Sequence, residues 1–222
     1  MPIYKTKNED FFKKWSPKMT YVLGFFAADG NMIKNKRGAH FIEFQSTDKE
    51  ILNKIKKCLK SNLAMGEYQP KNKNHSKRYG LQIGSKEIFN DLSRLEMTPN
   101  KSLTLKLPKI PDKYFNHFTR GYFDGDGNVT ISTYKRANRN NRKSITILSG
   151  FTSGSEKILE KLHVKLKKLA KILGGTKYYN RGYRLYFSVN DSLRLYKFLY
   201  KNLNENLYLS RKKKIFEKYF KI

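Results

Sequence analysis

Hydrophobic and polar positions follow the same succession of patterns in each half of the chain. In the first half, an apolar segment that runs from Pro17 to an Asp-Gly pair predicts a helix. Residues 31–36 and 39–45 then alternate as strands do, with apolar side chains on one face. An apolar helix, a second strand pair and a shorter helix follow. The second half repeats this order, so we expect two α-β-β-α-β-β-α units.

Local signals set the expected ends of the helices. Segments 47–50 and 153–156 each have the form of a capping box and predict the start of the helix that follows. The later of these helices keeps its apolar face through Leu173 and should end at the glycine pair that comes next. Gly30 and Gly127 are suited to the left-handed conformation that ends a helix.

One repeated segment shows how the two halves align. The sequences YVLGFFAADGNM (residues 21–32) and FTRGYFDGDGNV (residues 118–129) share a glycine, an aromatic pair and a final Asp-Gly-Asn. Their alignment places Asp29 over Asp126, 97 residues further along the chain. The repeat therefore divides the chain into two units of similar length.

The similarity continues beyond this segment. Gln45, at the end of a predicted strand, aligns with Thr152 in the second half. We therefore expect an α+β protein with two domains, residues 1–111 and residues 112–222. Each domain should contain a four-stranded antiparallel sheet with helices over one face and a polar, basic face left open.

The charge of the chain indicates what it binds. There are 47 Lys and Arg residues against 18 Asp and Glu residues, and the formal net charge of +29 is spread over both halves. Such a field over a folded surface favours a polyanion, most simply nucleic acid. A single cysteine and four scattered histidines exclude a disulfide framework and a zinc module, and no apolar run is long enough to span a membrane. Any metal should therefore be held by oxygen.

Small residues spaced four apart lie near the end of each repeated helix, on one face, where they allow two helix backbones to approach closely. They are Gly24, Ala28, Gly121 and Gly125. Paired helices would bring Asp29 and Asp126 together at two helix C-termini, where the dipole disfavours anions and a cation is needed. Oxygen ligands select Mg²⁺, for which Mn²⁺ or Ca²⁺ can substitute in binding. Further ligands would be the main-chain carbonyls of Ala28 and Gly125.

These residues carry a resemblance to a known family. VLGFFAADG (residues 22–30) and TRGYFDGDG (residues 119–127) resemble the two motif copies of the single-chain LAGLIDADG homing endonucleases. The resemblance covers nearly the whole chain and implies a monomer of two units related by a pseudo-twofold axis. It also implies that Asp29 and Asp126 bind divalent metal. The enzyme would cut both strands of a long DNA site across the minor groove and leave 3′ overhangs, as in intron homing.

The resemblance extends to three other catalytic positions. Gln45 matches a position where the family often has glutamine near the catalytic water. Lys101 and Lys212 fall where the family often has basic residues beside the scissile phosphates. Arg211 or Lys213 could take the second of these places.

One motif position departs from the family pattern. Where the family has aspartate at the sixth position, this chain has Ala27 in the first copy and Asp124 in the second. This position does not carry the metal-binding acid, so cleavage is still expected. We expect a local polar role for Asp124, with metal binding as the alternative.

The open sheet faces are the expected DNA-binding surfaces, because a β-ribbon can enter the major groove and read base edges. The polar strand residues expected there are Arg78, Gln82, Ser132, Thr146, Arg184 and the tyrosines Tyr134 and Tyr186. An insertion at 134–143 adds Arg136, Arg139 and Arg142 along the DNA backbone. Two sheets would cover roughly 20 base pairs of an asymmetric site.

A second class of function stays open at this level. An intron maturase that binds RNA, or a DNA- or RNA-binding protein that does not cut, would share the fold and the charge. Degenerate motif acids would favour that alternative, whereas both acids are present here. The preference for lysine over arginine suggests an A·T-rich coding sequence. We therefore expect an intracellular protein of an organelle, a phage-infected cell or a bacterium.

Overall fold

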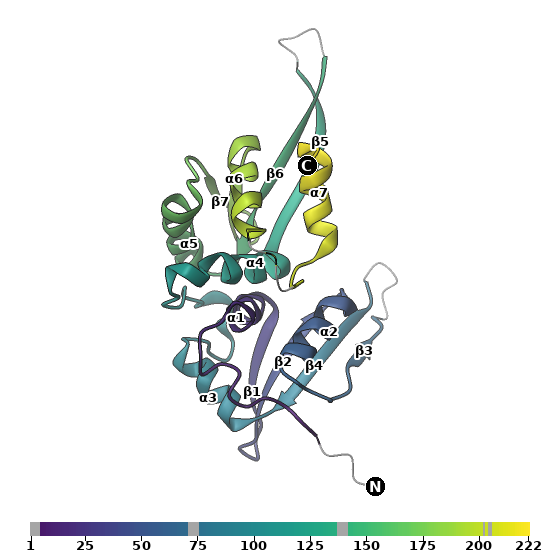
Figure 1. The fold of residues 1–222 in the computed structure, drawn as a ribbon, viewed down its shortest axis with the longest axis vertical. Helices are drawn as coiled ribbons and strands as arrows, with labels where there is room; N and C mark the ends of the chain where they lie inside the picture. The colour runs from purple at the N-terminus through teal and green to yellow at the C-terminus, as the bar shows by residue number, and fades with distance from the viewer. Residues whose placement is uncertain (1–4, 71–75, 137–141, 202, 204–205) are drawn as a thin grey trace.

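The computed structural model describes residues 5–70, 76–136, 142–201, 203 and 206–222. Two units of related architecture lie one beyond the other along the longest axis of the molecule (Figure 1). Helices α1 (Pro17–Asp29) and α4 (Phe115–Asp126) lie between them. No helix in these ranges is long and apolar enough to cross a membrane.

Each unit repeats one order of elements. In the first unit, α1 precedes β1 (Gly30–Lys34), β2 (His40–Ser46), α2 (Lys49–Cys58), β3 (Gly66–Tyr68), β4 (Arg78–Gly84) and α3 (Lys86–Arg94). In the second, α4 precedes β5 (Gly127–Arg136), β6 (Arg142–Ser153), α5 (Glu156–Ala170), β7 (Thr176–Tyr179), β8 (Tyr183–Phe187), α6 (Val189–Leu199) and α7 (Ser210–Phe220). The strands form antiparallel sheets of order β1-β2-β4-β3 and β5-β6-β8-β7. The predicted α+β class is confirmed, and α7 is an addition that the sequence pattern did not predict.

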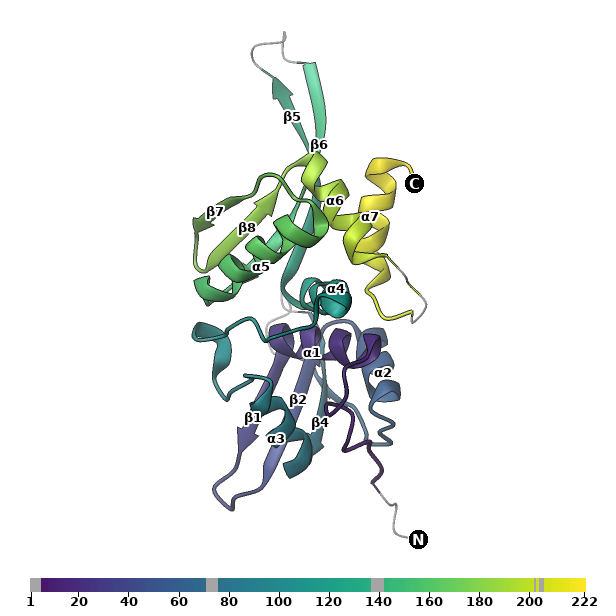
Figure 2. The ribbon, with the colours of Figure 1, turned by 60° about the vertical axis from the view of Figure 1, so that its left-hand side comes forward.

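Alternating side chains give each sheet one buried face and one open face. On β2, Ile42 and Phe44 are fully buried, while Gln45 is exposed. On β4, Leu81 is buried and its neighbour Gln82 is exposed. The buried faces lie under the helices, as Figure 2 shows for α3 in the first unit and α5 in the second. The open faces therefore carry the polar residues.

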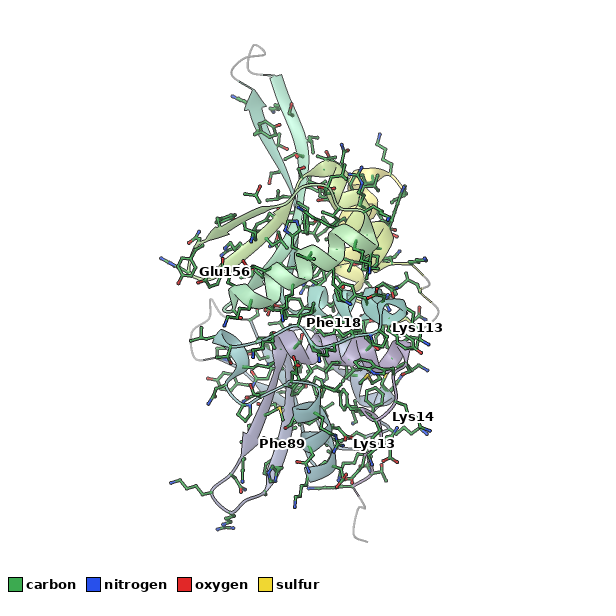
Figure 3. All side chains as sticks on the ribbon, turned by 90° about the vertical axis from the view of Figure 1, so that its left-hand side faces the viewer. Lys13, Lys14, Phe89, Lys113, Phe118 and Glu156 are labelled. Carbon is green, nitrogen blue, oxygen red and sulfur yellow. The ribbon has the colours of Figure 1, made fainter. Side chains whose placement is uncertain are left out.

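The two motif helices are buried on all sides rather than along one stripe. Met19–Ala27 of α1 and Phe115–Asp124 of α4 are continuously buried, because each helix packs on its own unit and on the other helix. A helix that is enclosed in this way needs apolar residues all round. Figure 3 labels Phe118, which lies in this central layer.

Small residues allow α1 and α4 to meet backbone to backbone. A Cβ atom on Gly24 would overlap the carbonyl oxygen of Phe118, and a Cβ atom on Gly121 would overlap the carbonyl oxygen of Tyr21. A Cβ atom on Gly125 would overlap the methyl group of Ala28. The four small residues identified in the sequence thus lie at the contact between the helices.

Several expected helix ends differ in detail. Gly30 and Gly127 have extended backbones, with φ of −94° and −80°, so neither takes the left-handed conformation. Glycine is required there for space, since a Cβ atom would overlap the phenylalanine four residues earlier in each copy. The helix predicted to reach the glycine pair ends at Ala170, where Lys171 is left-handed, and Leu173 is exposed.

The predicted capping boxes are also wrong. The N-caps of α2 and α5 are Asp48 and Ser155, and neither side chain makes a capping hydrogen bond. Instead, the serine two positions before each N-cap closes a local turn. Ser46 Oγ accepts a hydrogen bond from the Asp48 N–H, and Ser153 Oγ accepts one from the Ser155 N–H, both at 3.1 Å. Residues 46 and 153 are equivalent in the repeat, so the same serine turn precedes the helix in both units.

The first hairpin of the second unit is the main difference between the sheets. Strands β5 and β6 have 10 and 12 residues, against 5 and 7 in β1 and β2. The register continues to Arg136 opposite Arg142, so the hairpin extends well beyond the rest of the sheet (Figure 1). The predicted lengthening of this hairpin is confirmed.

Replacing Gly24 or Gly121 with alanine should lower the free energy of unfolding by about 2 kcal/mol or more, because the added methyl group meets fixed backbone atoms. Urea denaturation followed by circular dichroism measures the change. Gly66→Ala is the matched control, because the nearest atom to its Cβ would be 3.7 Å away, and it should change stability by less than about 0.5 kcal/mol. Equal effects at Gly24 and Gly66 would contradict the close contact.

Candidate active site at the paired helix ends

Two aspartates stand where the motif helices end side by side. Asp29 is the last residue of α1 and Asp126 is the last residue of α4. Both are half-buried. The glycine at position 125 leaves room for the first acid, since a Cβ atom there would lie 3.1 Å from Asp29 Oδ2. The close packing of the helices thus brings two acids from distant parts of the sequence into one place.

The environment of these acids disfavours their charged forms. Burial raises the pKa of Asp126 to about 7, and the nearby Asp29 charge adds to the effect. Burial also raises the pKa of Asp29. The positive charges of Lys212 and Lys101 act in the opposite direction on both acids. The protein alone therefore stabilises the charged forms of the two acids poorly, and a bound cation would stabilise them.

Two buried lysines flank the acids in a nearly symmetric way. Lys101 Nζ donates to the carbonyl oxygen of Gly30, and Lys212 Nζ donates to that of Gly127 at 2.7 Å. Each ammonium group also lies over the phenylalanine ring of its motif helix, 5.4 Å from the Phe26 centroid and 5.3 Å from the Phe123 centroid. The helix C-termini, which disfavour the acids, thus attract the lysines.

Burial lowers the pKa of both lysines to about 8, and the neighbouring acids act against this change. A pKa of about 8 leaves both lysines mostly protonated at neutral pH. The structure also distinguishes the candidates for the second basic position. Arg211 is paired with Asp48, with a shortest distance of 2.8 Å, and Lys213 is paired with Glu217, so Lys212 is the residue at the helix end.

Gln45 lies at the edge of the same site. It lines a hollow that also contains Asp29, Gly125 and Arg211. Its side-chain amide donates to Glu43 Oε2 at 3.0 Å. Its counterpart Thr152 is half-buried, and its carbonyl oxygen accepts a hydrogen bond from the Tyr122 hydroxyl at 3.5 Å. The two halves of the site therefore differ at this position.

The carboxylate oxygens at this site suit a hard divalent cation. Within the described ranges there is no group of three histidine, cysteine, aspartate or glutamate side chains that could hold a metal. The protein thus offers two carboxylates, Asp29 and Asp126, and phosphate oxygens and water would complete the coordination. The Gly125 carbonyl, one of the two main-chain ligands expected from the sequence, already accepts a hydrogen bond from Lys212 at 3.3 Å.

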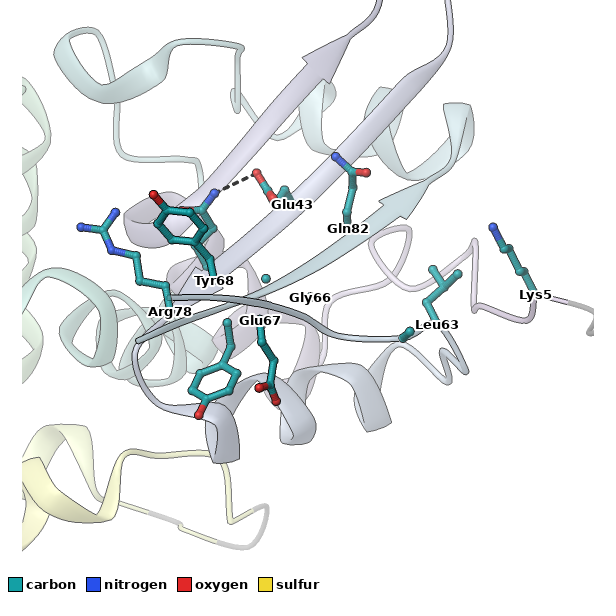
Figure 4. A pocket seen from close by; sticks show the side chains of 12 residues that line it. Lys5, Glu43, Leu63, Gly66, Glu67, Tyr68, Arg78 and Gln82 are labelled. Carbon is teal, nitrogen blue, oxygen red and sulfur yellow. Dashed lines mark hydrogen bonds between the residues drawn. The ribbon is translucent and has the colours of Figure 1, made fainter. Parts of the chain in front are cut away.

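The first sheet presents the expected polar residues on its open face. Arg78 and Gln82 are exposed on β4, and Gln82 pairs in register with Glu43 on β2. Figure 4 shows Gln82 and Glu43 side by side above the strands, with Arg78 further along the sheet. An acid among these side chains is a feature that the sequence pattern did not single out. Glu43 accepts a hydrogen bond from the Gln45 side chain and so orients it.

The second sheet presents a smaller part of its expected set. Ser132 is exposed and pairs in register with the half-buried Thr146, and Tyr134 is 44% exposed. Arg184 is half-buried and donates to the Tyr186 hydroxyl at 3.3 Å. Tyr186 itself is 9% exposed, because its ring packs on Gly150.

Other tyrosines are more accessible than Tyr186. The ring of Tyr178 stacks on Tyr186 at a centroid distance of 6.0 Å, and Tyr178 and Tyr179 are 45% and 69% exposed. Alternation along a single strand could not show that a tyrosine of the neighbouring strand β7 stacks on Tyr186 of β8. Of the hairpin arginines, Arg139 lies outside the described residues, and so do the side chains of Arg136 and Arg142.

Comparisons with known proteins agree with this architecture. Residues 16–95 match the LAGLIDADG-like domain, and residues 120–222 match the LAGLIDADG endonuclease domain. The chain is 30% identical over 131 residues to an uncharacterized protein of Methanocaldococcus jannaschii, which is 58% of this chain and 45% of that protein. It is 28% identical over 150 residues to the DNA-directed RNA polymerase subunit Rpo1C of the same organism, 67% of this chain and 15% of that protein. The chain thus spans less than half the length of either relative.

Solved structures resemble the whole chain. The meganuclease I-SmaMI bound to uncleavable DNA has a TM-score of 0.63 at 13% identity, with 93% of this chain and 89% of that chain covered. The LAGLIDADG meganuclease I-AabMI bound to uncleaved DNA has a TM-score of 0.61 at 14% identity, with 93% and 90% covered. These likenesses extend over both units. With a matching domain in each unit and an aspartate at the end of each motif helix, the chain belongs to the LAGLIDADG endonuclease family.

Proposed function

We propose that this protein is a monomeric, site-specific DNA endonuclease that uses a divalent metal to cut both strands of a long asymmetric site. The observation that carries the proposal is the meeting of Asp29 and Asp126 at the ends of two packed helices, with a buried lysine beside each motif. The cuts would fall across the minor groove and leave 3′ overhangs.

The charged groups of the site have distinct roles in this reaction. Asp29 and Asp126 would hold Mg²⁺, with Mn²⁺ as a substitute and Ca²⁺ supporting binding. A divalent cation in such a site supplies activation of water and stabilisation of the leaving oxygen. Lys101 and Lys212 are mostly protonated at neutral pH and are held against helix-end carbonyls, so their positive charge would stabilise the two scissile phosphates.

The hollow beside Asp29 supports a role for Gln45 in orienting water. Its amide nitrogen is held by Glu43 at 3.0 Å, which leaves the amide oxygen as an acceptor. Thr152 occupies the equivalent position in the second half and has a shorter side chain. We therefore expect the two strands to be cut at different rates.

The two open sheet faces support DNA binding on either side of the acids. Exposed polar side chains on β4 and β5 could read bases, and the net charge of +29 would attract phosphates. Two of the similar structures are meganucleases bound to DNA, which supports this placement of the duplex. Both motifs lie in one chain, so a monomer would contain the complete site.

The proposal is tested by cleavage of a randomised duplex DNA library with Mg²⁺. Recovery of a cleaved asymmetric site, lost when EDTA removes the metal, is the expected result. Sequencing of the product ends gives the overhang. A library that stays intact with Mg²⁺ and with Mn²⁺ would overturn the proposed activity.

Changing Asp29 or Asp126 to asparagine should slow double-strand cleavage by about 100-fold or more while leaving DNA binding nearly unchanged, because a carboxylate ligand is lost and the fold is kept. Cleavage rates and gel-shift affinities on the selected site measure the two effects. Asp112→Asn is the matched control, since Asp112 is a partly exposed acid paired with Lys165 on the surface. Rapid cleavage by both site variants would rule out these acids.

DNA binding should weaken steeply as salt rises, because phosphate contacts release counterions. The slope of log K against log salt should be about −0.9 for each neutralised phosphate. Fluorescence anisotropy measured at several salt concentrations between about 50 and about 300 mM gives this slope. A nearly flat response would contradict phosphate binding by the basic surface.

A further inference from the structure

Asp124 joins three helices through one buried carboxylate. Its Oδ2 accepts a hydrogen bond from the Tyr21 hydroxyl at 2.6 Å and another from the Leu209 main-chain N–H at 3.0 Å. Tyr21 belongs to α1 of the first unit, and Leu209 is the N-cap residue of α7 in the second. Asp124 itself is in α4 and is 2% exposed. The two motif helices and the start of α7 are therefore held by the same side chain.

The two positions equivalent to Tyr21 and Asp124 in the repeat carry neither a hydroxyl nor a carboxyl group. The alignment that places Asp29 over Asp126 also places Ala27 over Asp124 and Phe118 over Tyr21. Alanine and phenylalanine cannot form a side-chain hydrogen bond, and both residues are buried. The acid and the hydroxyl are thus both present in the Tyr21–Asp124 pair and both absent from the equivalent pair, Phe118 and Ala27. This is expected of two groups that act as a pair.

The helix that Asp124 holds is the one that carries Lys212. The main-chain N–H groups of Lys212 and Lys213 donate to the Leu209 carbonyl at 3.1 and 3.3 Å, so Leu209 begins the turn in which Lys212 lies. A bond to the Leu209 N–H therefore sets the position of the whole first turn.

The ammonium group of Lys212 depends on that position. It donates to the carbonyl oxygens of Phe123 at 2.6 Å and Asp124 at 2.7 Å, besides those of Gly125 and Gly127. Lys101 is held differently, since it opens the short 3₁₀ turn Lys101–Leu103 after the left-handed Asn100. Its placement involves no carboxylate from the motif helix, because that position is Ala27.

We propose that Asp124, together with Tyr21, is a positioning pair for Lys212, and that cleavage of one DNA strand depends on this pair while cleavage of the other does not. The inference rests on the proposed endonuclease function. A residue of the first unit, Tyr21, would thereby control cutting by the second unit.

The test compares the double variant Tyr21→Phe/Asp124→Ala with the wild type. This variant carries the same residues as Phe118 and Ala27, which the protein already buries at the equivalent positions, so it is designed to fold. On the selected site with each strand labelled, the rate for one strand should fall about 10- to 100-fold, and the rate for the other should stay within about twofold. A merely structural role would slow both strands together.

Two single variants complete the set. Asp124→Asn keeps an oxygen that can accept both hydrogen bonds, and it should restore most of the wild-type ratio between the strands. Tyr200→Phe is the matched control, because Tyr200 is buried and its hydroxyl has no hydrogen-bond partner among the residues that the structure describes. It should cut both strands at wild-type rates.

A second measurement does not require cleavage. Hydrogen exchange at the Leu209 amide should rise about tenfold or more in Asp124→Ala, since this amide loses a charged acceptor. If the wild type cuts no DNA, the proposed function fails, and this exchange measurement still decides whether Asp124 holds α7. An unchanged exchange rate at Leu209, or an unchanged ratio between the strands in an active double variant, would overturn the inference.

Discussion

The direct contact between the backbones of α1 and α4 is the constraint on which the rest of the structure depends. Gly24 and Gly121 each face a carbonyl oxygen of the opposite helix with no room for a side chain. This closeness makes two helices from separate units into one central layer. Both helices end at the same side of that layer, so their last residues, Asp29 and Asp126, lie close to each other.

The electrostatics of the site follow from this packing. Two half-buried acids at two helix C-termini repel each other and are poorly solvated, and the pKa of Asp126 rises to about 7. Lys101 and Lys212 balance part of the charge, but burial lowers the pKa of each to about 8. All four groups are therefore less stable in their charged forms than they would be in water. Such an arrangement is costly for folding alone and is typical of a site built to bind charged reactants.

Much of this could be predicted from the sequence because the information was local or repeated. Alternation of apolar residues located the strands, and the spacing of Gly24 and Ala28 indicated a helix contact. The helix ends were less predictable. Gly30 is required by the space beside Phe26 rather than by a left-handed backbone, and a sequence shows that a glycine is present without showing which of these reasons applies.

The polar contacts between units could not be predicted in the same way. The bond between Tyr21 and Asp124 joins residues 103 positions apart, and it depends on the helix crossing that only the folded chain defines. The same holds for the pairing of Arg211 with Asp48, which joins residues of the two units. The burial of Tyr186 could not be predicted either, since it depends on contacts with Gly150 and with Tyr178 of the neighbouring strand.

The most direct test of the central claim is a crystal structure of the protein with its selected DNA site and Mn²⁺, with the ion located by its anomalous scattering. The account predicts manganese in contact with the carboxylates of Asp29 and Asp126, and duplex DNA along the open faces of both sheets. Manganese bound away from both carboxylates, or DNA bound along the helical surface, would contradict it.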